Sequence, residues 1–250
     1  MKRGRAATIN VLALATVLAL AATSADAALI GVDYSQAGQD VFPGTTAETV
    51  ANNDVGSGSL TTSNIGDPTG GSAIVDVTIT EIGDDDNLEA RGGNGANSRA
   101  DLDPADHPLA DVAEDLISTR GGKLEIKISG LPAGEFRFRG VFNDSYTVNE
   151  GFASGSVFDI LLTDANDTAF NVFSDVEASN VNSSTGTIAS RTFGVISDGT
   201  SDVTILLNET AANNRGFIPL SGFTVVPEPT SLLLLGVVGM LLLVRRGPRT

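Results

Sequence analysis

Residues 123–142 read KLEIKISGLPAGEFRFRGVF, and their pattern is the clearest indication of the fold class. Apolar and polar side chains alternate on both sides of the segment Gly130-Leu-Pro-Ala-Gly134. Alternation with a period of two is the pattern of a half-buried β-strand, and glycine with proline favours a tight connection. The stretch therefore predicts two β-strands, and we expect them to pair with each other as an antiparallel hairpin over 123–142.

Similar alternating runs, separated by clusters of Gly, Asn, Asp and Ser, occur along most of the chain. Their apolar positions are Ile30, Val32 and Tyr34; Val75, Val77 and Ile79; Phe158, Ile160 and Leu162; Phe170 and Val172; Val203, Ile205 and Leu207; and Phe223 and Val225. Many short strands with frequent turn signals predict an all-β fold, an antiparallel β-sandwich of jelly-roll type. The sequence of residues 128–136 also resembles a segment found in secreted bacterial β-sandwich modules.

Two segments depart from the strand pattern. Pro108 suits the first position of a helix, and Leu109, Val112 and Leu116 would share one helical face, so a short helix is expected at 108–117. Residues 44–71 are rich in Thr, Gly, Ser and Asn, and we expect a long connection there.

The N-terminus carries the features of an export signal. Lys2, Arg3 and Arg5 precede a mostly apolar stretch over 6–22, and Ala25-Asp-Ala27 follows it. A basic start, an apolar centre and a small-x-small cleavage site are typical of a secretory signal peptide. Residues 1–27 are therefore expected to be a signal peptide, with an uncleaved N-terminal anchor as the alternative.

The C-terminus has its own hydrophobic segment. Residues 226–231 read VPEPTS, 13 apolar or glycine residues follow from Leu232 to Val244, and Arg245 and Arg246 come next. As a helix this run would span roughly 20 Å at ~1.5 Å per residue, short of the ~30 Å core of a bilayer. The segment 232–244 is expected to enter the inner membrane at least transiently, with both arginines on the cytoplasmic side.

This tail resembles the PEP-CTERM sorting signal of bacterial envelope and exopolysaccharide-associated proteins. The matching residues are Pro227, Glu228 and Pro229, the apolar run, and Arg245 with Arg246. The resemblance implies that a membrane-embedded exosortase cuts near the Pro-Glu-Pro element after export, leaving the protein in the cell envelope or the extracellular matrix of a biofilm. Retention of the tail as a simple anchor is the alternative. The expected organisation is a signal peptide over 1–27, a sandwich body over 28–225 and a sorting segment over 226–250.

The charge of the chain excludes one class of partner. The full chain has a formal net charge of −16. Residues 28–226 hold 9 of the 15 basic and 29 of the 31 acidic residues, so their net charge is 9 − 29 = −20. Such a surface repels the phosphate backbone, so nucleic-acid binding is not expected. The chain has no Cys, which excludes thiol chemistry and cysteine-based metal centres.

Clustered acidic residues give the best metal candidates. The first cluster is Asp84, Asp85, Asp86 and Asn87, and the second is Asp101, Asp103 and Asp106. Calcium prefers six to eight oxygen ligands, which closely spaced Asp and Asn supply. Neither cluster has the glycine and terminal glutamate of an EF-hand loop. A solvated acidic turn is the simpler interpretation, calcium is the alternative, and no other cofactor is expected.

No catalytic residues are assigned. His107 is the only histidine, and no Gly-x-Ser-x-Gly element accompanies it, so a serine-hydrolase triad is not indicated. Carboxylate pairs for a glycosidase would arise by chance in so acidic a chain.

Three functions are compatible with the sequence. The first is an exported, surface- or matrix-associated non-enzymatic β-sandwich. The second is a carbohydrate-binding module, with or without calcium, acting on an extracellular polysaccharide. The third is a secreted hydrolase. Polar residues with exposed Phe or Tyr on a concave surface would favour the second over the first, whereas a deep pocket holding an acid with a raised pKa would favour the third.

Overall fold

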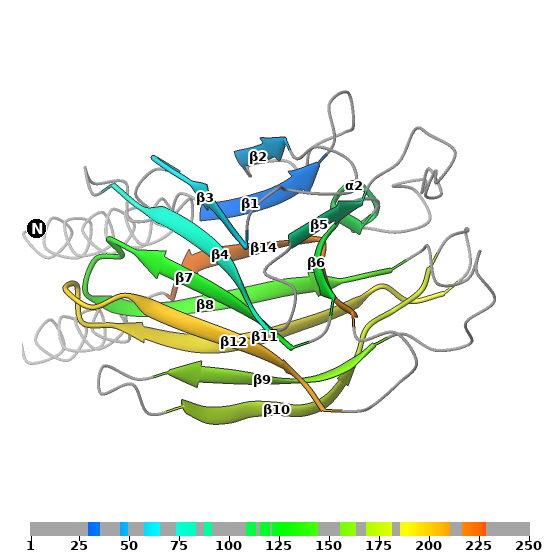
Figure 1. Ribbon diagram of the computed structural model, residues 1–250. Helices are drawn as coiled ribbons and strands as arrows, with labels where there is room; N and C mark the ends of the chain where they lie inside the picture. Colours follow the sequence, from blue (N-terminus) through cyan, green and yellow to red (C-terminus); the bar gives the residue numbers. More distant parts are fainter. Residues whose placement is uncertain are drawn as a thin grey trace, which may run out of the picture.

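The computed structural model describes residues 30–35, 46–49, 58–65, 74–83, 88–91, 109–113, 116–120, 122–144, 156–163, 169–181, 186–210 and 217–228 (Figure 1). These residues form three β-sheets and one short helix. The signal peptide, both acidic clusters, His107, Pro229 and the 232–250 tail lie outside them. Within the described part, no helix is long and apolar enough to cross a membrane.

Two large sheets make up most of the fold. The five-stranded sheet has the order β11-β8-β14-β1-β2 and consists of β1 (Ile30–Ser35), β2 (Thr46–Thr49), β8 (Gly134–Phe142), β11 (Ala189–Ser197) and β14 (Gly222–Pro227). The six-stranded sheet has the order β10-β9-β12-β7-β4-β3 and consists of β3 (Ser59–Thr62), β4 (Asp76–Ile82), β7 (Lys123–Ser129), β9 (Val157–Thr163), β10 (Ala169–Glu177) and β12 (Val203–Glu209).

A third, smaller sheet packs against both. It has the order β13-β6-β5 and consists of β5 (Leu88–Arg91), β6 (Leu116–Arg120) and β13 (Phe217–Leu220). Its buried side chains, such as Ile117 and Leu220, belong to the main hydrophobic core. The strand pairs are antiparallel except for β1 and β2, which run parallel. The predicted all-β, antiparallel, sandwich-like architecture is thus confirmed, and its jelly-roll version stays a prediction.

Phenylalanine rings join the two large sheets. Phe142 of β8 meets Phe158 of β9 edge to face, with ring centroids 5.1 Å apart. Phe173 of β10 meets Phe193 of β11 in the same manner at 6.2 Å. Within the five-stranded sheet, Phe138 packs against Phe193 at 5.1 Å. Edge-to-face rings at these separations add to the free energy gained from burial alone, so aromatic contacts across the layers help to hold the sandwich together.

The expected hairpin over 123–142 is wrong in its pairing. Both strands exist, but β7 pairs with β4 and β12 in one sheet, whereas β8 pairs with β11 and β14 in the other. Residues 130–133 therefore carry the chain from one layer to the next, and Leu131 is buried at the crossing. In such an arch the strands face each other through their apolar side chains. A hairpin and an arch have the same alternation, so the local pattern could not separate them.

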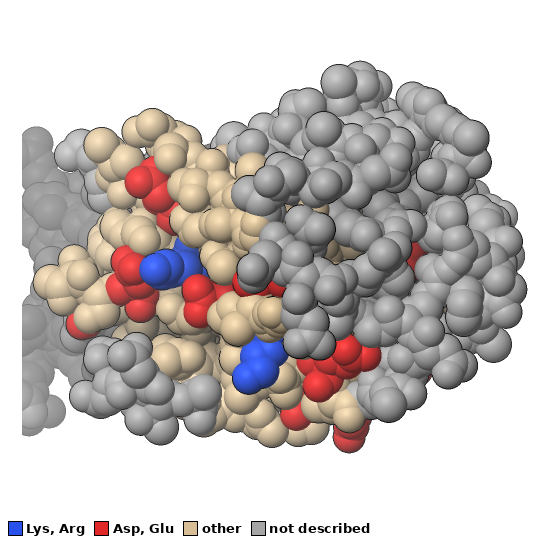
Figure 2. Space-filling view, viewed as in Figure 1, with Lys and Arg blue, Asp and Glu red and all other residues tan. Residues whose placement is uncertain are grey.

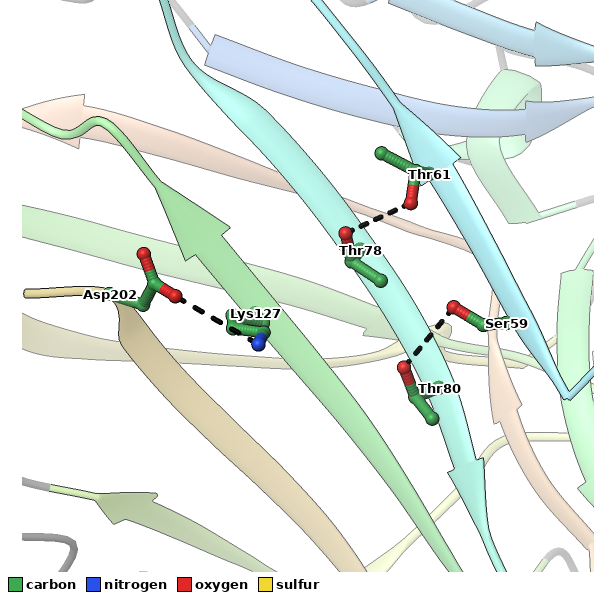
Figure 3. Close-up of polar contacts among 6 residues, drawn as sticks. All are labelled: Ser59, Thr61, Thr78, Thr80, Lys127 and Asp202. Atoms are coloured by element: carbon green, nitrogen blue, oxygen red, sulfur yellow. Dashed lines mark hydrogen bonds and ion pairs between the residues drawn. The ribbon is translucent and has the colours of Figure 1, made fainter.

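Two further expectations need correction. The helix predicted at 108–117 is only α2 (Ala110–Ala113), because Leu116 already begins β6. Within the expected 44–71 connection, the chain forms β2 and β3, each four residues long. Hydroxyl pairs support β3: Thr61 bonds Thr78 at 3.0 Å, and Ser59 bonds Thr80 at 3.4 Å (Figure 3). Threonine favours a strand wherever a neighbouring strand offers such a cross-strand partner.

A buried asparagine ties α2 to the sandwich. Asn143 follows β8 and is fully buried. Its Nδ2 donates to the carbonyl oxygens of Ala113 (2.9 Å) and Val181 (3.0 Å). Its Oδ1 accepts from the Ser179 hydroxyl (2.7 Å) and from the Val181 N–H (2.9 Å). These four bonds use the full hydrogen-bonding capacity of the amide, so Asn143 holds α2 next to the segment that follows β10.

Candidate functional site

The residues singled out at the C-terminal tail begin inside the fold. Pro227 is the last residue of β14 and lies opposite Phe136 of β8. The Glu228 N–H donates to the Glu135 carbonyl oxygen at 2.9 Å, and Glu228 Oε1 accepts from Arg137 Nε and lies near Arg137 Nη2, both at 3.2 Å. The first part of the Pro-Glu-Pro element is thus held against the five-stranded sheet. Ala25, Ala27, Pro229, Arg245 and Arg246 lie outside the described residues.

The metal candidates lie outside the described residues as well. Asp84, Asp85, Asp86 and Asn87 fall between β4 and β5, and Asp101, Asp103 and Asp106 precede α2. Within the described ranges, no three His, Asp or Glu residues gather into a group that could hold a metal ion. Calcium binding by either cluster therefore stays a prediction.

A groove opens where the two large sheets end side by side. Among the described strands, β10 is the last strand of the six-stranded sheet and β11 the last of the five-stranded sheet. Between them lies a cavity of about 610 Å³. This volume falls within the ~300–1,000 Å³ typical of small-molecule sites. We call it the edge groove; it is lined by Leu162, Thr163, Phe170, Asn171, Val172, Phe193, Gly194, Ile196, Ser197, Asp198, Ser201, Asp202 and Val203.

The apolar part of the edge groove contains unusually exposed side chains. Phe193 and Val203 are buried core residues, whereas Phe170 is 49% exposed and Ile196 is 77% exposed. Phe170 lies opposite Leu162, whose neighbours Ile160 and Phe158 point into the core. It is therefore on the inner face of its sheet, at a position where the partner sheet no longer covers it. An exposed aromatic ring beside a cavity is a typical ligand contact.

The edge strand β10 is irregular at this point. Its register with β9 shifts between Asn171 and Phe173 and again before Val176. Asp175 has a positive φ of 51°, and its N–H donates to Asp159 Oδ1 at 3.0 Å. Bulges of this kind bend an edge strand and disfavour pairing with another chain. They also turn β10 locally next to Asn171, which lines the edge groove.

The polar part of the groove comes from the β11–β12 loop, which is tied down by its own side chains. Asp198 Oδ1 accepts from the backbone N–H groups of Thr200 and Ser201, both at 2.7 Å, and Oδ2 accepts from the Ser201 hydroxyl at 2.8 Å. The Ser197 hydroxyl donates to the Leu131 carbonyl oxygen at 3.0 Å and accepts from the Gly199 N–H at 3.1 Å. The loop is therefore anchored to the arch between β7 and β8, which pre-organises its polar groups.

The groove is negatively charged, and the carboxylate of Asp198 stays ionised. The backbone N–H of Ser201, with that of Thr200 and the Ser201 hydroxyl, holds the pKa of Asp198 well below its usual range. Asp202 Oδ2 lies 3.9 Å from Lys127 Nζ, on the outer face of the six-stranded sheet (Figure 3). A general acid needs a raised pKa, and the shift at Asp198 has the opposite sign. Partial burial raises the pKa of Glu209, but Glu209 does not line the groove.

The outer face of the six-stranded sheet, in contrast, carries mainly polar side chains. Its outward positions include Thr78 and Thr80 of β4, Glu125 and Lys127 of β7 and Thr204 of β12. Figure 2 shows isolated basic patches on this side of the described surface, with acidic atoms close to each of them. Polar side chains paired with their neighbours across strands are typical of a solvated sheet face. The edge groove, with its exposed ring, is therefore the better candidate site.

Sequence reasoning did not find this site. The expected strand with Phe170 and Val172 is β10, but β11 and the 198–202 loop had no predicted role. Phe193 and Val195 of β11 do alternate with polar or glycine residues. The closeness of β10 and β11 depends on strand pairing across the whole chain, which alternation does not reveal.

Comparison with known proteins gives no family assignment. No protein-family model and no curated protein matches the chain. Among solved structures, the fold is similar to a family 35 carbohydrate-binding module from Clostridium thermocellum, with 11% identity, 46% of this chain and 78% of that chain covered, and a TM-score of 0.31. A plant receptor-like kinase aligns at 12% identity over 64% of this chain and 50% of that chain, with a TM-score of 0.41. A cleaved adhesin domain of Lys-gingipain from Porphyromonas gingivalis aligns at 11% identity over 68% and 99%, with a TM-score of 0.35. At these TM-scores the similarities carry no inference about function.

Proposed function

We propose that this protein is an exported, non-enzymatic component of a bacterial cell envelope or extracellular matrix, and that its sandwich body binds polysaccharide in the edge groove. The observation that carries the binding role is the exposed Phe170 ring in a cavity that is also lined by Asp198, Ser201 and Asp202 of the pre-organised β11–β12 loop. A sugar ring has an apolar face that can lie against an aromatic ring and hydroxyls that can bond to Asn, Ser and Asp. A groove with one apolar wall and one polar end matches that division.

The acids of the groove support the non-enzymatic part of the proposal. Glycoside hydrolysis requires two facing carboxyl groups, one of which stays protonated as the general acid. Asp198 is held as an anion by three hydrogen bonds from its own loop. Binding without bond cleavage is therefore the expected chemistry.

The export part rests on the two terminal segments. A secretory signal over 1–27 and the PEP-CTERM-like segment over 226–250 would place the protein outside the cytoplasm and recruit the export machinery and an exosortase-type enzyme. Intact-mass measurement on protein from its native host tests this. The expected result is loss of residues 1–27 and of the residues after about 228. Recovery of the unprocessed chain in the cytoplasm would contradict export.

Truncation of Phe170 tests the binding role. The native protein is screened on a glycan array, and the affinity of the best oligosaccharide is then measured for Phe170→Ala. We expect about tenfold weaker binding, because removing a central aromatic contact costs more than about 1 kcal/mol. The matched control is Ile82→Ala, which shortens a side chain that is 44% exposed and lies outside the groove. Unchanged affinity of Phe170→Ala, or no bound glycan at all, would refute the proposal.

A further inference from the structure

The edge groove has an acidic end with no basic counterpart inside it. Asp198 and Asp202 both line the groove and are both exposed. Among the described residues that line it, none is Lys, Arg or His. Lys127 approaches Asp202 from outside the groove, at 3.9 Å, with both side chains about 40% exposed. A contact of this length and exposure is a weak ion pair, so it leaves most of the negative potential of the groove in place.

Hydrogen bonds within the β11–β12 loop position the carboxylate of Asp198. Its Oδ1 accepts two hydrogen bonds and its Oδ2 accepts one, all from residues 200 and 201. The same bonds keep the carboxylate charged and fixed in place. A ligand that donates a charged N–H group would gain a charge-assisted hydrogen bond here, which is stronger than a neutral one.

The net charge of the whole chain also favours a positively charged ligand. The chain has a net charge of −16, and acidic atoms outnumber basic ones on the described surface shown in Figure 2. Such a field attracts cationic polymers and repels polymers of uronic acids, which would bring further carboxylates to Asp198 and Asp202. Neutral sugars would be neither attracted nor repelled by this field.

We propose that the groove selects polysaccharides that carry free amino groups, with the ammonium groups at the Asp198–Asp202 end and the sugar rings against Phe170. This inference rests on the proposed function, because it names the ligand class of the same groove. In this proposal, the charges of Asp198 and Asp202 determine which polysaccharide is selected, and the Phe170 ring contributes affinity for sugar rings in general.

The test compares three oligosaccharides of equal length by titration calorimetry on the full-length native protein. The probes are a β-1,4-linked glucosamine oligomer, its fully N-acetylated form and a galacturonic acid oligomer, all in the presence of a chelator so that no metal bridges the contact. At a pH where the amines are protonated, we expect the glucosamine oligomer to bind at least tenfold more tightly than the N-acetylated one. The advantage should shrink at high salt and when the amines are neutral.

Two variants locate the effect. Asp198→Asn should weaken binding of the glucosamine oligomer about fivefold more than it weakens binding of the N-acetylated oligomer, as expected for loss of one unit charge near a ligand in water. Lys127→Gln should strengthen binding of the glucosamine oligomer, because Asp202 loses its positive neighbour.

The outcomes separate the two proposals. Equal binding of the charged and the acetylated oligomers, weakened in both cases by Phe170→Ala, would overturn the charge selection and leave the polysaccharide site intact. Preference for the galacturonic acid oligomer would also overturn the charge selection. Absence of binding to all three probes, together with an empty glycan array, would remove the proposed function as well.

Discussion

Gly130 is the residue at which the chain leaves one large sheet for the other. Its φ is +78°, in the left-handed region that residues with a Cβ rarely adopt. A Cβ built at this position would also lie 2.1 Å from the Ile74 carbonyl oxygen. Backbone atoms cannot move aside as the end of a side chain can, so both conformation and space require glycine here.

We predict that Gly130→Ala lowers the free energy of unfolding by about 2–4 kcal/mol, from the cost of a non-glycine residue at positive φ together with the backbone clash. Gly194→Ala is the matched control, because a Cβ on Gly194 meets nothing within 4 Å. We expect that variant to match the native protein or exceed it slightly, since alanine is favoured over glycine in a strand. Denaturant unfolding of the two variants measures the difference, and equal stability would show that the arch tolerates a side chain.

Asp198 gives the 198–202 loop a dependence on pH. Its pKa is lowered in the folded protein, first by the Ser201 N–H and then by that of Thr200. A lowered folded-state pKa means that the stabilising contribution is present above the unfolded value of about 4 and is lost as the pH falls below it. The native protein and Asp198→Ala should therefore differ in melting temperature at neutral pH and converge on acidification.

Carboxyl NMR titration tests the cause directly. The Asp198 signal should titrate below the normal aspartate range, and Ser201→Ala should raise its pKa because one hydroxyl donor is lost. A normal pKa for Asp198 in the native protein would show that the loop does not hold the carboxylate in place. It would also weaken the assignment of a fixed charge to the groove.

At the level of elements, the polar contacts around Asn143 connect α2, the end of β8 and the 178–181 segment. One amide bonds to two carbonyl oxygens, a hydroxyl and an N–H group. The single proton of the Ser179 hydroxyl is shared between Asn143 Oδ1 and the Phe142 carbonyl oxygen, which lies 3.1 Å away, and the hydroxyl oxygen accepts from the Ala189 N–H at 2.9 Å. This network fixes the start of β11 at Ala189, and later residues of the same strand, from Phe193 to Ser197, line the edge groove.

Asn143→Ala should therefore cost about 3–5 kcal/mol, because buried backbone groups of Ala113 and Val181 lose their partner and each such group costs about 1–3 kcal/mol. Asn208→Ala is the control, since Asn208 is only half-buried on the outer face of β12; we expect a change within about 1 kcal/mol. Thermal unfolding of both variants checks this. A loss at Asn143 no greater than at Asn208 would mean that the network contributes little.

The elements also show what the sequence could predict. The expected strands at 30–34, 124–128, 136–142, 158–162, 170–172, 203–207 and 223–225 lie within strands of the structure, and the strand expected at 75–79 matches β4 except that β4 begins one residue later, at Asp76. One-sided burial makes such alternation visible in the sequence. The partner of each strand could not be predicted in the same way. The 123–142 stretch shows why: a hairpin and an arch bury the same residues and differ only in which distant strands supply the hydrogen bonds.

At the scale of the whole molecule, the site arises from the way the sheets end. The inner faces of β10 and β11 carry apolar residues as core strands do, but at the edge Phe170 extends beyond the cover of the opposite layer. No local motif marks such a position. The acidic balance and the terminal segments were visible in the sequence because they depend on composition, whereas the groove depends on the pairing of strands far apart in the chain.

NMR chemical-shift mapping of the tightest-binding oligosaccharide on the native protein tests directly whether polysaccharide binds in the edge groove. We predict that the largest amide shifts fall at Asn171, Gly194 and Ser201 in the edge groove, and that Thr78 and Glu125 on the outer face of the six-stranded sheet stay unchanged. Shifts concentrated on that outer face, with the groove unaffected at saturation, would contradict the account.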